Sequence, residues 1–226
     1  MTQNNAIVLT DGLLMTSDAK TAHGLIRGSE RFNIIGLVDG EANAGKDAGV
    51  LLDGKHRGIP VFATMELAIE KLEKVHYLII GVATVGGRLP INMLALIYDA
   101  VKKGISVVNG LHEYLNDKAD LVALAASTGA ALIDVRKPKL RADLHFWDGA
   151  IFNVTAPIVA VIGMDCAMGK RTTARMLKKA CTTEGMKAEM IYTGQTGWLQ
   201  GGQYGFIFDS TLNDFVSGEL EHAIVS

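Results

Sequence analysis

Short apolar runs alternate with longer stretches of helical periodicity through the first 137 residues, and this alternation limits the folds open to the chain. Strands that alternate with helices predict right-handed β–α–β units and a mostly parallel sheet. The run at 76–80 is uninterrupted, which is typical of a strand covered on both faces. We expect strands at 6–9, 32–38, 59–62, 76–80, 105–108 and 130–135, and helices at 19–27, 65–72, 92–103 and 117–127, the last with Asp117 as its N-cap.

Ligands of parallel sheets bind beyond the carboxyl ends of the strands. Four loops fall there in the expected fold: Asp11-Gly12, Asp39-Gly40, the segment GVATVGGR at 81–88 and the segment NGLHE at 109–113. The first strand-to-helix turn lacks the G-x-G-x-x-G pattern with which dinucleotide-binding sheets hold a pyrophosphate. The sequence therefore permits binding of NAD by this part of the chain but does not favour it.

A second α/β domain is expected to begin at residue 158. Residues 138–157 carry two prolines and no helical period, and we interpret them as the connection between two domains. The apolar strand expected at 158–162 opens a P-loop-containing domain that runs to residue 226. This stretch is shorter than a parallel sheet covered on both faces usually needs. We therefore expect an incomplete domain, or one completed by a partner subunit, which favours a homo-oligomer.

The stretch IGMDCAMGKRTT at 162–173 has the character of a phosphate-binding loop. The common P-loop, G-x-x-x-x-G-K-[ST], surrounds phosphate oxygens with backbone N–H groups, and the helix after it points its N-terminus at the same anion. Here five residues rather than four separate the glycines, and Arg171 follows the lysine. The alternative is a glycine-rich turn with a surface lysine. The expected anion ligands are Gly163, Asp165, Gly169, Lys170, Thr172 and Thr173.

Acidic residues and a cysteine add further candidates around this loop. Asp165 gives it the spacing G-x-D-x-x-x-G-K, which resembles the loop of dethiobiotin synthetases, enzymes that phosphorylate a carbamate. Cys166 is either a reactive thiol at a helix N-terminus or a small filler. Asp209 and Asp214 are candidate Mg²⁺ ligands or bases, and the alternatives are an N-cap for Asp209 and a solvated helix face for Asp214.

Composition excludes several classes of protein. The chain is 49% hydrophobic and 20% charged, which is ample for a folded core and far from the composition of disordered proteins. A net charge of −2 gives no general attraction to nucleic acid or to an acidic membrane surface. We see no secretory signal and no apolar run long enough to span a membrane, and the two cysteines lack metal-site spacing. We therefore expect a cytoplasmic protein with no metal site.

Together, several segments resemble the DUF1611 family, which contains the D-glutamate N-acetyltransferases. The resemblance covers the whole chain, although this chain looks C-terminally shortened. It implies a Rossmann-like N-terminal domain over 1–137 followed by a P-loop domain. The segments are DAKTAHGLIR (18–27), GLVDGEANAGKDAGVLLDG (36–54), GIPVF (58–62), IIGVATVGGRLP (79–90), NGLHEYL (109–115), DVRKP (134–138), GMDCAMGKRTTA (163–174), YTGQTGW (192–198) and DFVSGELE (214–221).

The resemblance implies transfer of an acetyl group from acetyl-CoA to the amino group of D-glutamate, in the catabolism of that D-amino acid. Coenzyme A carries a pyrophosphate and a 3′-phosphate, so the P-loop could hold it without hydrolysing a nucleotide. The two carboxylates of the acceptor bind best to arginine or lysine side chains. A general base must also remove a proton from its ammonium group before the nitrogen can attack. Our candidates are Lys20, Arg88 and Arg136 for the carboxylates, His112 or Asp214 for the base, and Gln195 as an oxyanion donor.

Two other functions stay open at the level of sequence. In the first, the P-loop holds ATP and Mg²⁺ and the protein is a ligase or kinase that activates a small carboxylate. The loop spacing favours this reading, whereas the lack of a clear second nucleotide motif weakens it. In the second, the chain binds a nucleotide or coenzyme A without catalysing a reaction and serves as a subunit or sensor. The role of His112 also stays open: it either contributes to a ligand site or is simply a polar residue at the start of a helix.

Overall fold

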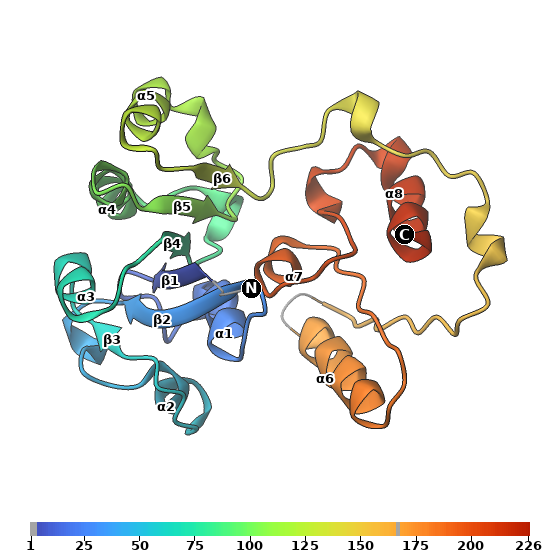
Figure 1. Cartoon of the computed structure of the whole chain (residues 1–226), viewed down its shortest axis with the longest axis horizontal. Helices are drawn as coiled ribbons and strands as arrows, with labels where there is room; N and C mark the ends of the chain where they lie inside the picture. Colours follow the sequence, from blue (N-terminus) through green and yellow to red (C-terminus); the bar gives the residue numbers. More distant parts are fainter. Residues whose placement is uncertain (1–3, 166–167) are drawn as a thin grey trace. The chain divides into compact units, whose positions relative to one another are not determined.

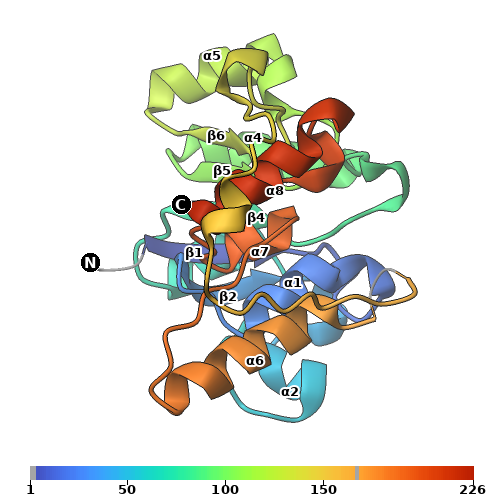
Figure 2. The same ribbon diagram turned by 90° about the vertical axis from the view of Figure 1, so that its right-hand side faces the viewer.

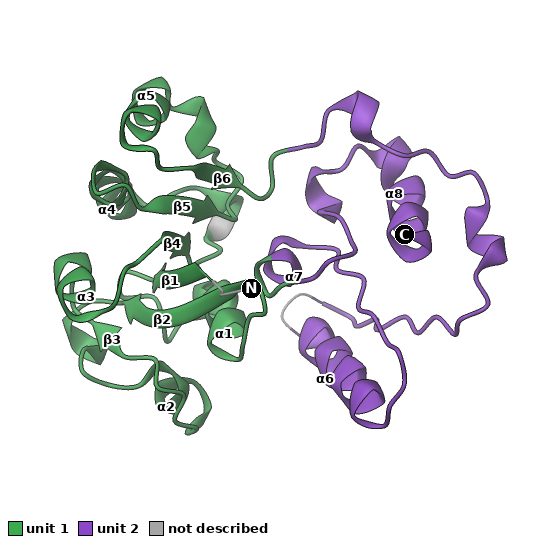
Figure 3. Ribbon diagram, viewed as in Figure 1, with its two compact units in different colours: residues 1–137, 199–201 green, residues 138–198, 202–226 purple. Residues whose placement is uncertain are grey.

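The computed structural model describes residues 4–165 and 168–226, which form two compact units (Figure 3). Unit 1 comprises residues 1–137 and 199–201, and unit 2 comprises residues 138–198 and 202–226. The division falls between Lys137 and Pro138. The segment 138–157, which we expected to be a connection, is therefore part of unit 2. No helix in the described ranges is long and apolar enough to cross a membrane.

Unit 1 contains the expected parallel sheet, and its fold class is confirmed (Figure 1). All five strand pairs are parallel, and the order is β3-β2-β1-β4-β5-β6. The apolar run at 6–9 lies in the central strand, where Val8 pairs with Leu37 on one side and Ile79 on the other. The strands are β1 (Asn4–Leu9), β2 (Phe32–Val38), β3 (Val61–Phe62), β4 (Tyr77–Ile80), β5 (Ser106–Asn109) and β6 (Leu132–Asp134).

Helices cover both faces of this sheet. Figure 1 shows α3, α4 and α5 along one face and α1 on the other. The main core lies on the first of these faces, where Ile7, Leu78 and Ile80 of the strands pack with Met93 and other apolar residues of α4. Alternate strand residues thus face opposite helix layers, as a doubly covered sheet requires. The helices are α1 (Lys20–Ile26), α2 (Ala48–Asp53), α3 (Met65–Lys71), α4 (Ile91–Lys102) and α5 (Ala119–Thr128).

Helix α5 begins later than the sequence predicts. Asp117 does not cap it; it ends a short 3-10 helix, and the N-cap position of α5 is Lys118, which makes no side-chain cap bond. The reason lies in the preceding loop. The carboxylate of Asp134 accepts hydrogen bonds from the backbone N–H groups of Leu115 and Asn116, at 3.0 and 2.9 Å, and holds them in that 3-10 turn.

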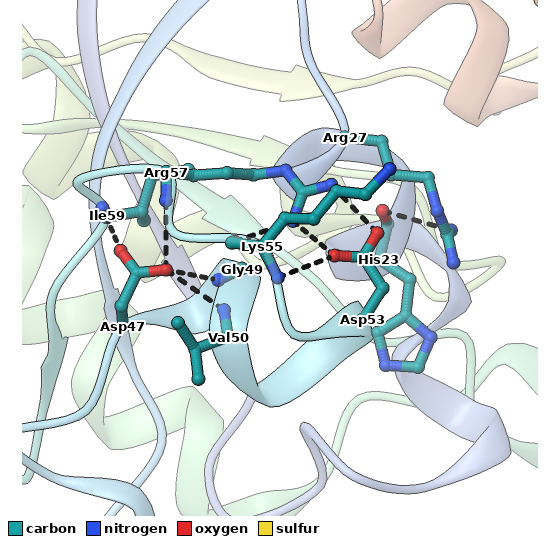
Figure 4. A network of polar contacts seen from close by, with 9 residues as sticks. All are labelled: His23, Arg27, Asp47, Gly49, Val50, Asp53, Lys55, Arg57 and Ile59. Carbon is teal, nitrogen blue, oxygen red and sulfur yellow. Dashed lines mark hydrogen bonds and ion pairs between the residues drawn. The ribbon is translucent and has the colours of Figure 1, made fainter.

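Helix α2 lies between the strands expected at 32–38 and 59–62, where we predicted no helix from the sequence. Asp47 caps the helix and gathers four backbone N–H donors, those of Gly49, Val50, Arg57 and Ile59, at 2.8–3.1 Å (Figure 4). Burial alone would raise the pKa of Asp47, but the backbone donors outweigh it and the pKa is lowered. The carboxylate of Asp47 therefore ties together the backbone at both ends of the segment 47–59.

A short segment from late in the chain completes unit 1. Ser29 Oγ donates to the carbonyl oxygen of Leu199 at 2.7 Å, and Gln200 Nε2 donates to the carbonyl oxygens of Gly24 and Gly28 at 2.7 and 3.1 Å. Gly24 lies near the end of α1, where carbonyl groups lack partners within the helix. The side chain of Gln200 therefore supplies a hydrogen-bond donor to the carbonyl groups at the carboxyl end of α1, although it lies more than 170 residues away in sequence.

Unit 2 contains α6 (Lys170–Thr183), most of α7 (Gln195–Leu199) and α8 (Val216–Val225). The strand that we expected at 158–162 is not formed, and Val159 is 73% and Ile162 87% exposed. Farther along the described chain, Tyr192 makes an isolated bridge to Gly205. The physical reason is that a strand needs a neighbour to pair its backbone groups. No such neighbour lies beside residues 158–162 in the described part of unit 2.

The segment 138–157 runs around α8 in unit 2 (Figure 1). Glu221 of α8 accepts hydrogen bonds from the backbone N–H groups of Asp148 and Ile151, at 2.8 and 3.1 Å. Gly218 lies so close to the backbone of His145 and Phe146 that a β-carbon there would overlap them. The motif GELE therefore has a local physical explanation, since its glycine allows close packing and its glutamates bind backbone donors.

Candidate functional site

The phosphate-binding loop ends directly at the N-terminus of α6, a helix of 14 residues (Figures 1 and 2). Gly169 adopts a left-handed conformation, with φ of +88°, and its carbonyl oxygen accepts the first helical bond from Thr173 N at 2.9 Å. Lys170 and Thr172 follow in the first turn and are half-buried. A helix N-terminus preceded by such a turn favours anions, as the sequence predicts. Cys166 lies outside the described residues.

Lys170 folds back over this loop. Its Nζ donates a hydrogen bond to the carbonyl oxygen of Asp165 at 2.5 Å. A methyl group at Gly163 would lie 3.3 Å from both Cγ and Cδ of the lysine, so the absence of a side chain there makes room for it. The structure thus brings Gly163, Asp165 and Lys170 together. The ammonium group lies within the loop, where it can neutralise a bound phosphate.

The motif YTGQTGW follows the P-loop helix, and its Gly197 packs against Tyr192 together with two glycines that lie beyond the motif. A β-carbon at Gly197, Gly202 or Gly205 would overlap the tyrosine side chain or its backbone. This packing holds the start of α7, where Gln195 is 7% exposed. The expected oxyanion donor is therefore buried at the beginning of a helix.

The acidic candidates lie on the surface of unit 2. Asp214 is in a 3-10 turn (Asn213–Phe215) that leads into α8, and Asp209 is in an earlier 3-10 turn (Phe208–Ser210). Both side chains are exposed.

A carboxylate–imidazole pair in unit 2 was not predicted from the sequence. Glu219 is 2% exposed, and its Oε1 lies 2.8 Å from His145 Nδ1, while its Oε2 accepts from Lys139 Nζ at 2.6 Å. Burial by itself raises the pKa of Glu219, yet the bonds from Lys139 and His145 prevail and lower it. Because an ionised carboxylate only accepts, His145 donates through Nδ1. The ring also stacks on His222, with centroids 3.6 Å apart.

In unit 1, two predicted residues lie in contact beyond the carboxyl ends of the strands. Arg136 follows β6 and is 9% exposed, and its Nε donates to the carbonyl oxygen of Gly110 at 2.7 Å. Its Nη1 lies 2.9 Å from His112 Nε2, in the loop after β5. The structure therefore brings together a residue that we expected to bind substrate and one that we expected to act as a base.

The other predicted cations lie on neighbouring loops of unit 1. Arg88, in the loop after β4, is exposed and is close enough to Glu113 for its charge to lower the pKa of that carboxyl. The larger causes of this shift are hydrogen bonds from Lys118 Nζ, at 2.8 Å, and from Leu89 N. Lys20 begins α1 and is exposed.

Asp39, directly after β2, is bound by the loops around it. An acidic residue at the end of the second strand usually binds the ribose of NAD. Here Asp39 is buried, and its Oδ1 accepts from Thr10 Oγ1 at 2.6 Å and from the backbone N–H groups of Gly12 and Leu14. Its Oδ2 accepts from Asn43 Nδ2 at 2.7 Å. The carboxylate therefore holds the loop after β1.

Comparison with known proteins agrees with this two-unit architecture. Residues 41–138 match the family model described as "Domain of unknown function (DUF1611_N) Rossmann-like domain". Residues 145–226 match the one described as "Domain of unknown function (DUF1611_C) P-loop domain". The chain belongs to the DUF1611 family. The family relationship confirms the Rossmann-like and P-loop assignments made from the sequence.

Two curated relatives carry the same name, D-glutamate N-acetyltransferase. The protein from Tritonibacter scottomollicae is 33% identical over 158 residues, which is 70% of this chain and 46% of the relative. The protein from Pseudoalteromonas sp is 32% identical over 143 residues, which is 63% of this chain and 42% of the relative. The chain thus spans less than half the length of the curated relatives that it matches.

A solved structure resembles this chain over nearly its whole length. It is the crystal structure of a DUF1611 family protein from Anabaena variabilis ATCC 29413 at 2.30 Å resolution. The TM-score is 0.87 and the sequence identity 31%, with coverage of 98% of this chain and 62% of the other. The relative is therefore longer than the chain described here.

Proposed function

We propose that this protein is an N-acetyltransferase that moves the acetyl group of acetyl-CoA to the amino group of D-glutamate. The observation that carries the proposal is the loop at 163–170, with Lys170 Nζ held inside it at the N-terminus of α6, in a chain whose curated relatives bear that name. A loop of this kind binds phosphate groups, and acetyl-CoA is the phosphate-bearing partner in such a reaction.

The donor is proposed to bind through its phosphates. Backbone N–H groups at the start of α6, together with Lys170, surround and neutralise a pyrophosphate oxygen, while the hydroxyls of Thr172 and Thr173 supply further donors. This role needs no hydrolysis of a nucleotide. It also needs no metal ion, and Arg171 stands directly after the lysine, where the common P-loop has the serine or threonine whose hydroxyl binds Mg²⁺.

The acceptor is proposed to bind through its two carboxylates, with Arg136, Arg88 and Lys20 as the cationic candidates. In the reaction the amine nitrogen forms a bond to the thioester carbonyl carbon, and the carbon–sulfur bond breaks. The ammonium group of the acceptor gives one proton to the base and a second is lost when the amide forms; the coenzyme A thiolate leaves and takes up one proton. Gln195 is the proposed donor to the oxyanion.

The base is proposed to be Asp214 or, as an addition from the structure, His145. The Nε2 atom of His112 is already in contact with Arg136, which argues against His112 in that role. His145 has the arrangement in which a buried carboxylate orients an imidazole, because Nδ1 is bound to Glu219 and Nε2 is the remaining acceptor of the neutral ring. Its side chain is 43% exposed, so the ring is accessible to a substrate.

A second candidate is an ATP-dependent ligase or kinase. The observation in its favour is the loop spacing, with Asp165 two residues after Gly163 and threonines in the first turn of α6. In that case the loop would hold ATP and Mg²⁺ and the protein would activate a carboxylate. A chain that only binds a nucleotide or coenzyme A is the corresponding non-catalytic alternative.

Calorimetric titration separates these functions. The chain is titrated with acetyl-CoA and, separately, with ATP plus Mg²⁺, and both titrations are repeated on Lys170→Ala. Lys179→Ala is the matched control, since Lys179 is an exposed lysine of the same helix. We expect acetyl-CoA to bind the wild type and the control and to bind Lys170→Ala at least ~10-fold more weakly, as expected for loss of a charged contact. Binding of ATP and Mg²⁺ without acetyl-CoA would overturn the proposal in favour of the ligase or kinase.

A further inference from the structure

The stretch 158–162 of unit 2 is exposed, although its residues are those of a buried strand. Ile158 is 58%, Val159 73% and Ile162 87% exposed. A strand built only of apolar residues is typical of a sheet that is covered on both faces. An exposed apolar run of this kind marks a surface that another polypeptide covers.

The backbone of the same stretch is also unpaired. In the part of the chain that the structure describes, the N–H and C=O groups of residues 158–162 make no hydrogen bond. An unpaired extended segment is a template for strand addition, in which a second chain supplies the missing backbone partners. The partner that fits here must therefore bring an apolar strand of its own.

The order of the five residues is self-complementary. The sequence Ile-Val-Ala-Val-Ile is the same in both directions about Ala160. If two copies of the stretch pair antiparallel with a two-fold axis at Ala160, Ile158 of one copy lies opposite Ile162 of the other, and Val159 lies opposite Val161. Matched apolar pairs of this kind stabilise neighbouring strands. A two-fold interface between identical chains requires such a self-complementary surface.

The charge pattern permits the same pairing. Residues 149–164 contain no charged side chain, and the whole chain has a net charge of only −2. Charged residues on an exposed strand are a common means by which proteins prevent pairing between copies, and this stretch has none. Two copies can therefore approach along residues 158–162 without placing like charges opposite each other.

The stretch leads directly into the phosphate-binding loop, which begins at Gly163 (Figures 1 and 2). In a two-fold antiparallel pair, the two loops leave the paired strands at opposite ends. At about 3.4 Å per residue, a pair of this length places the starts of the loops about 15–20 Å apart. Each copy therefore keeps its own phosphate-binding loop, and the strand of the other copy lies beside its starting point.

We propose that residues 158–162 form a dimerisation strand, which pairs antiparallel with the same residues of a second copy of this chain. This inference goes beyond the proposed function, because it holds whichever reaction the phosphate-binding loop serves. The contact is small compared with the 20–30 residues that each partner contributes to a typical stable interface, roughly speaking. We therefore expect a weak dimer whose population depends on protein concentration.

Sedimentation velocity of the full chain tests the association. We expect the wild type to change from monomer to dimer between about 1 and 200 µM. Val159→Lys and Val161→Glu each place a charge opposite an apolar side chain, and each is expected to raise the Kd of the dimer at least ~10-fold. Val225→Lys and Val225→Glu are the controls, because Val225 is an exposed valine of the same unit, and they should stay within about 3-fold of the wild type.

Mixing the two variants tests the register of the pairing. Because Val159 of one copy lies opposite Val161 of the other, a mixed dimer of Val159→Lys and Val161→Glu brings the introduced charges together as an oppositely charged pair. We expect the mixture to associate at least ~5-fold more tightly than either variant alone. Recovery on mixing also shows that the single substitutions weaken pairing without unfolding unit 2.

Hydrogen exchange gives an independent readout of the same contact. The amides of residues 158–162 are expected to exchange more slowly as the protein concentration rises through the Kd, because paired backbone groups are protected. Exchange that is independent of concentration while the chain dimerises would place the interface elsewhere and overturn the inference.

Three further results would contradict the proposal. A wild type that stays monomeric up to about 200 µM would leave the stretch to be covered by a different polypeptide. A dimer that is equally tight in the wild type, in Val159→Lys and in Val161→Glu would not use this strand. A mixture of the two variants that associates no better than each alone would exclude the antiparallel register.

Discussion

Lys170 Nζ donates a hydrogen bond to the carbonyl oxygen of Asp165 at 2.5 Å, so the lysine of the P-loop lies across its own loop. A methyl group at Gly163 would lie 3.3 Å from Cγ and Cδ of the lysine, which is a tight contact, so glycine at this position lets the side chain fold back without crowding. The spacing between the two glycines, five residues instead of the common four, therefore still brings the lysine into the loop. An incoming phosphate would exchange the carbonyl oxygen for a charged acceptor, which is the stronger partner of an ammonium group.

We expect Gly163→Ala to weaken binding of acetyl-CoA about 5- to 10-fold with little effect on stability, because the methyl group displaces Lys170 from an exposed loop. Calorimetry and thermal unfolding measure the two effects. Gly194→Ala is the control, since no atom lies within 4 Å of the added carbon and its φ is not positive. Unchanged affinity in Gly163→Ala would show that the position of the lysine does not matter for binding.

Glu219→Gln is expected to destabilise the protein by about 2 kcal/mol. The buried carboxylate binds Lys139, the backbone of His145 and the ring of His145, and a neutral amide weakens these charge-assisted bonds. Denaturant unfolding followed by circular dichroism measures the change. Glu184→Gln, an exposed glutamate of the same unit, should leave stability within about 0.5 kcal/mol of the wild type. Equal stability of the two variants would contradict the role of Glu219.

Asp47→Asn is expected to destabilise unit 1, by about 2 kcal/mol. An amide has one acceptor oxygen, so its NH₂ group would face some of the four backbone N–H donors that the carboxylate now binds. Hydrogen exchange of the amides of Gly49, Val50, Arg57 and Ile59 localises the effect. Glu41→Gln, an exposed change earlier in the same loop, is the control. Unaltered protection of these amides would refute the organising role of Asp47.

Acidification should remove a stabilising contribution from the pair Asp53–Arg57. Two bonds from the guanidinium group, at 2.7 and 2.8 Å, lower the pKa of Asp53 from 3.8 to about 2. Because the folded pKa is below the unfolded one, the stabilisation is complete above pH 3.8 and is lost as the pH falls through about 2. Asp53→Asn should therefore show a smaller loss of stability than the wild type between these pH values. Glu66→Gln, an exposed change on α3, should follow the wild type.

The sheet of unit 1 was predictable because each of its strands is a short apolar run that can be recognised from the neighbouring residues alone. The run FNIIGLV forms β2 with the predicted bounds, Phe32–Val38, since apolar β-formers are bounded there by polar residues. Helix α2 was missed because its stability comes from Asp47 and from donors up to twelve residues away, a contact that no periodicity reveals. The strand predicted at 158–162 failed for the opposite reason, since its residues have strand character but lack a paired neighbour in the described chain.

The residues of the candidate site also fall into two groups, those that a local sequence pattern predicts and those that only the fold brings together. The loop glycines and Lys170 follow a local spacing, so they could be found from the sequence. Glu219 and His145 are 74 residues apart, and Arg136 and His112 are 24 residues apart, so only the fold brings each pair together. The signal available in advance was the motif GELE, whose glutamates in an otherwise apolar helix pattern indicate buried carboxylates with partners elsewhere.

The most direct test of the proposed function is the release of coenzyme A thiol from acetyl-CoA by this chain, measured with and without D-glutamate and with L-glutamate in parallel, with the product identified by mass spectrometry. We predict thiol release that depends on D-glutamate, formation of N-acetyl-D-glutamate, and loss of both in Lys170→Ala but not in Lys179→Ala. Release of ADP or phosphate from ATP without any acetylated product would contradict the proposal.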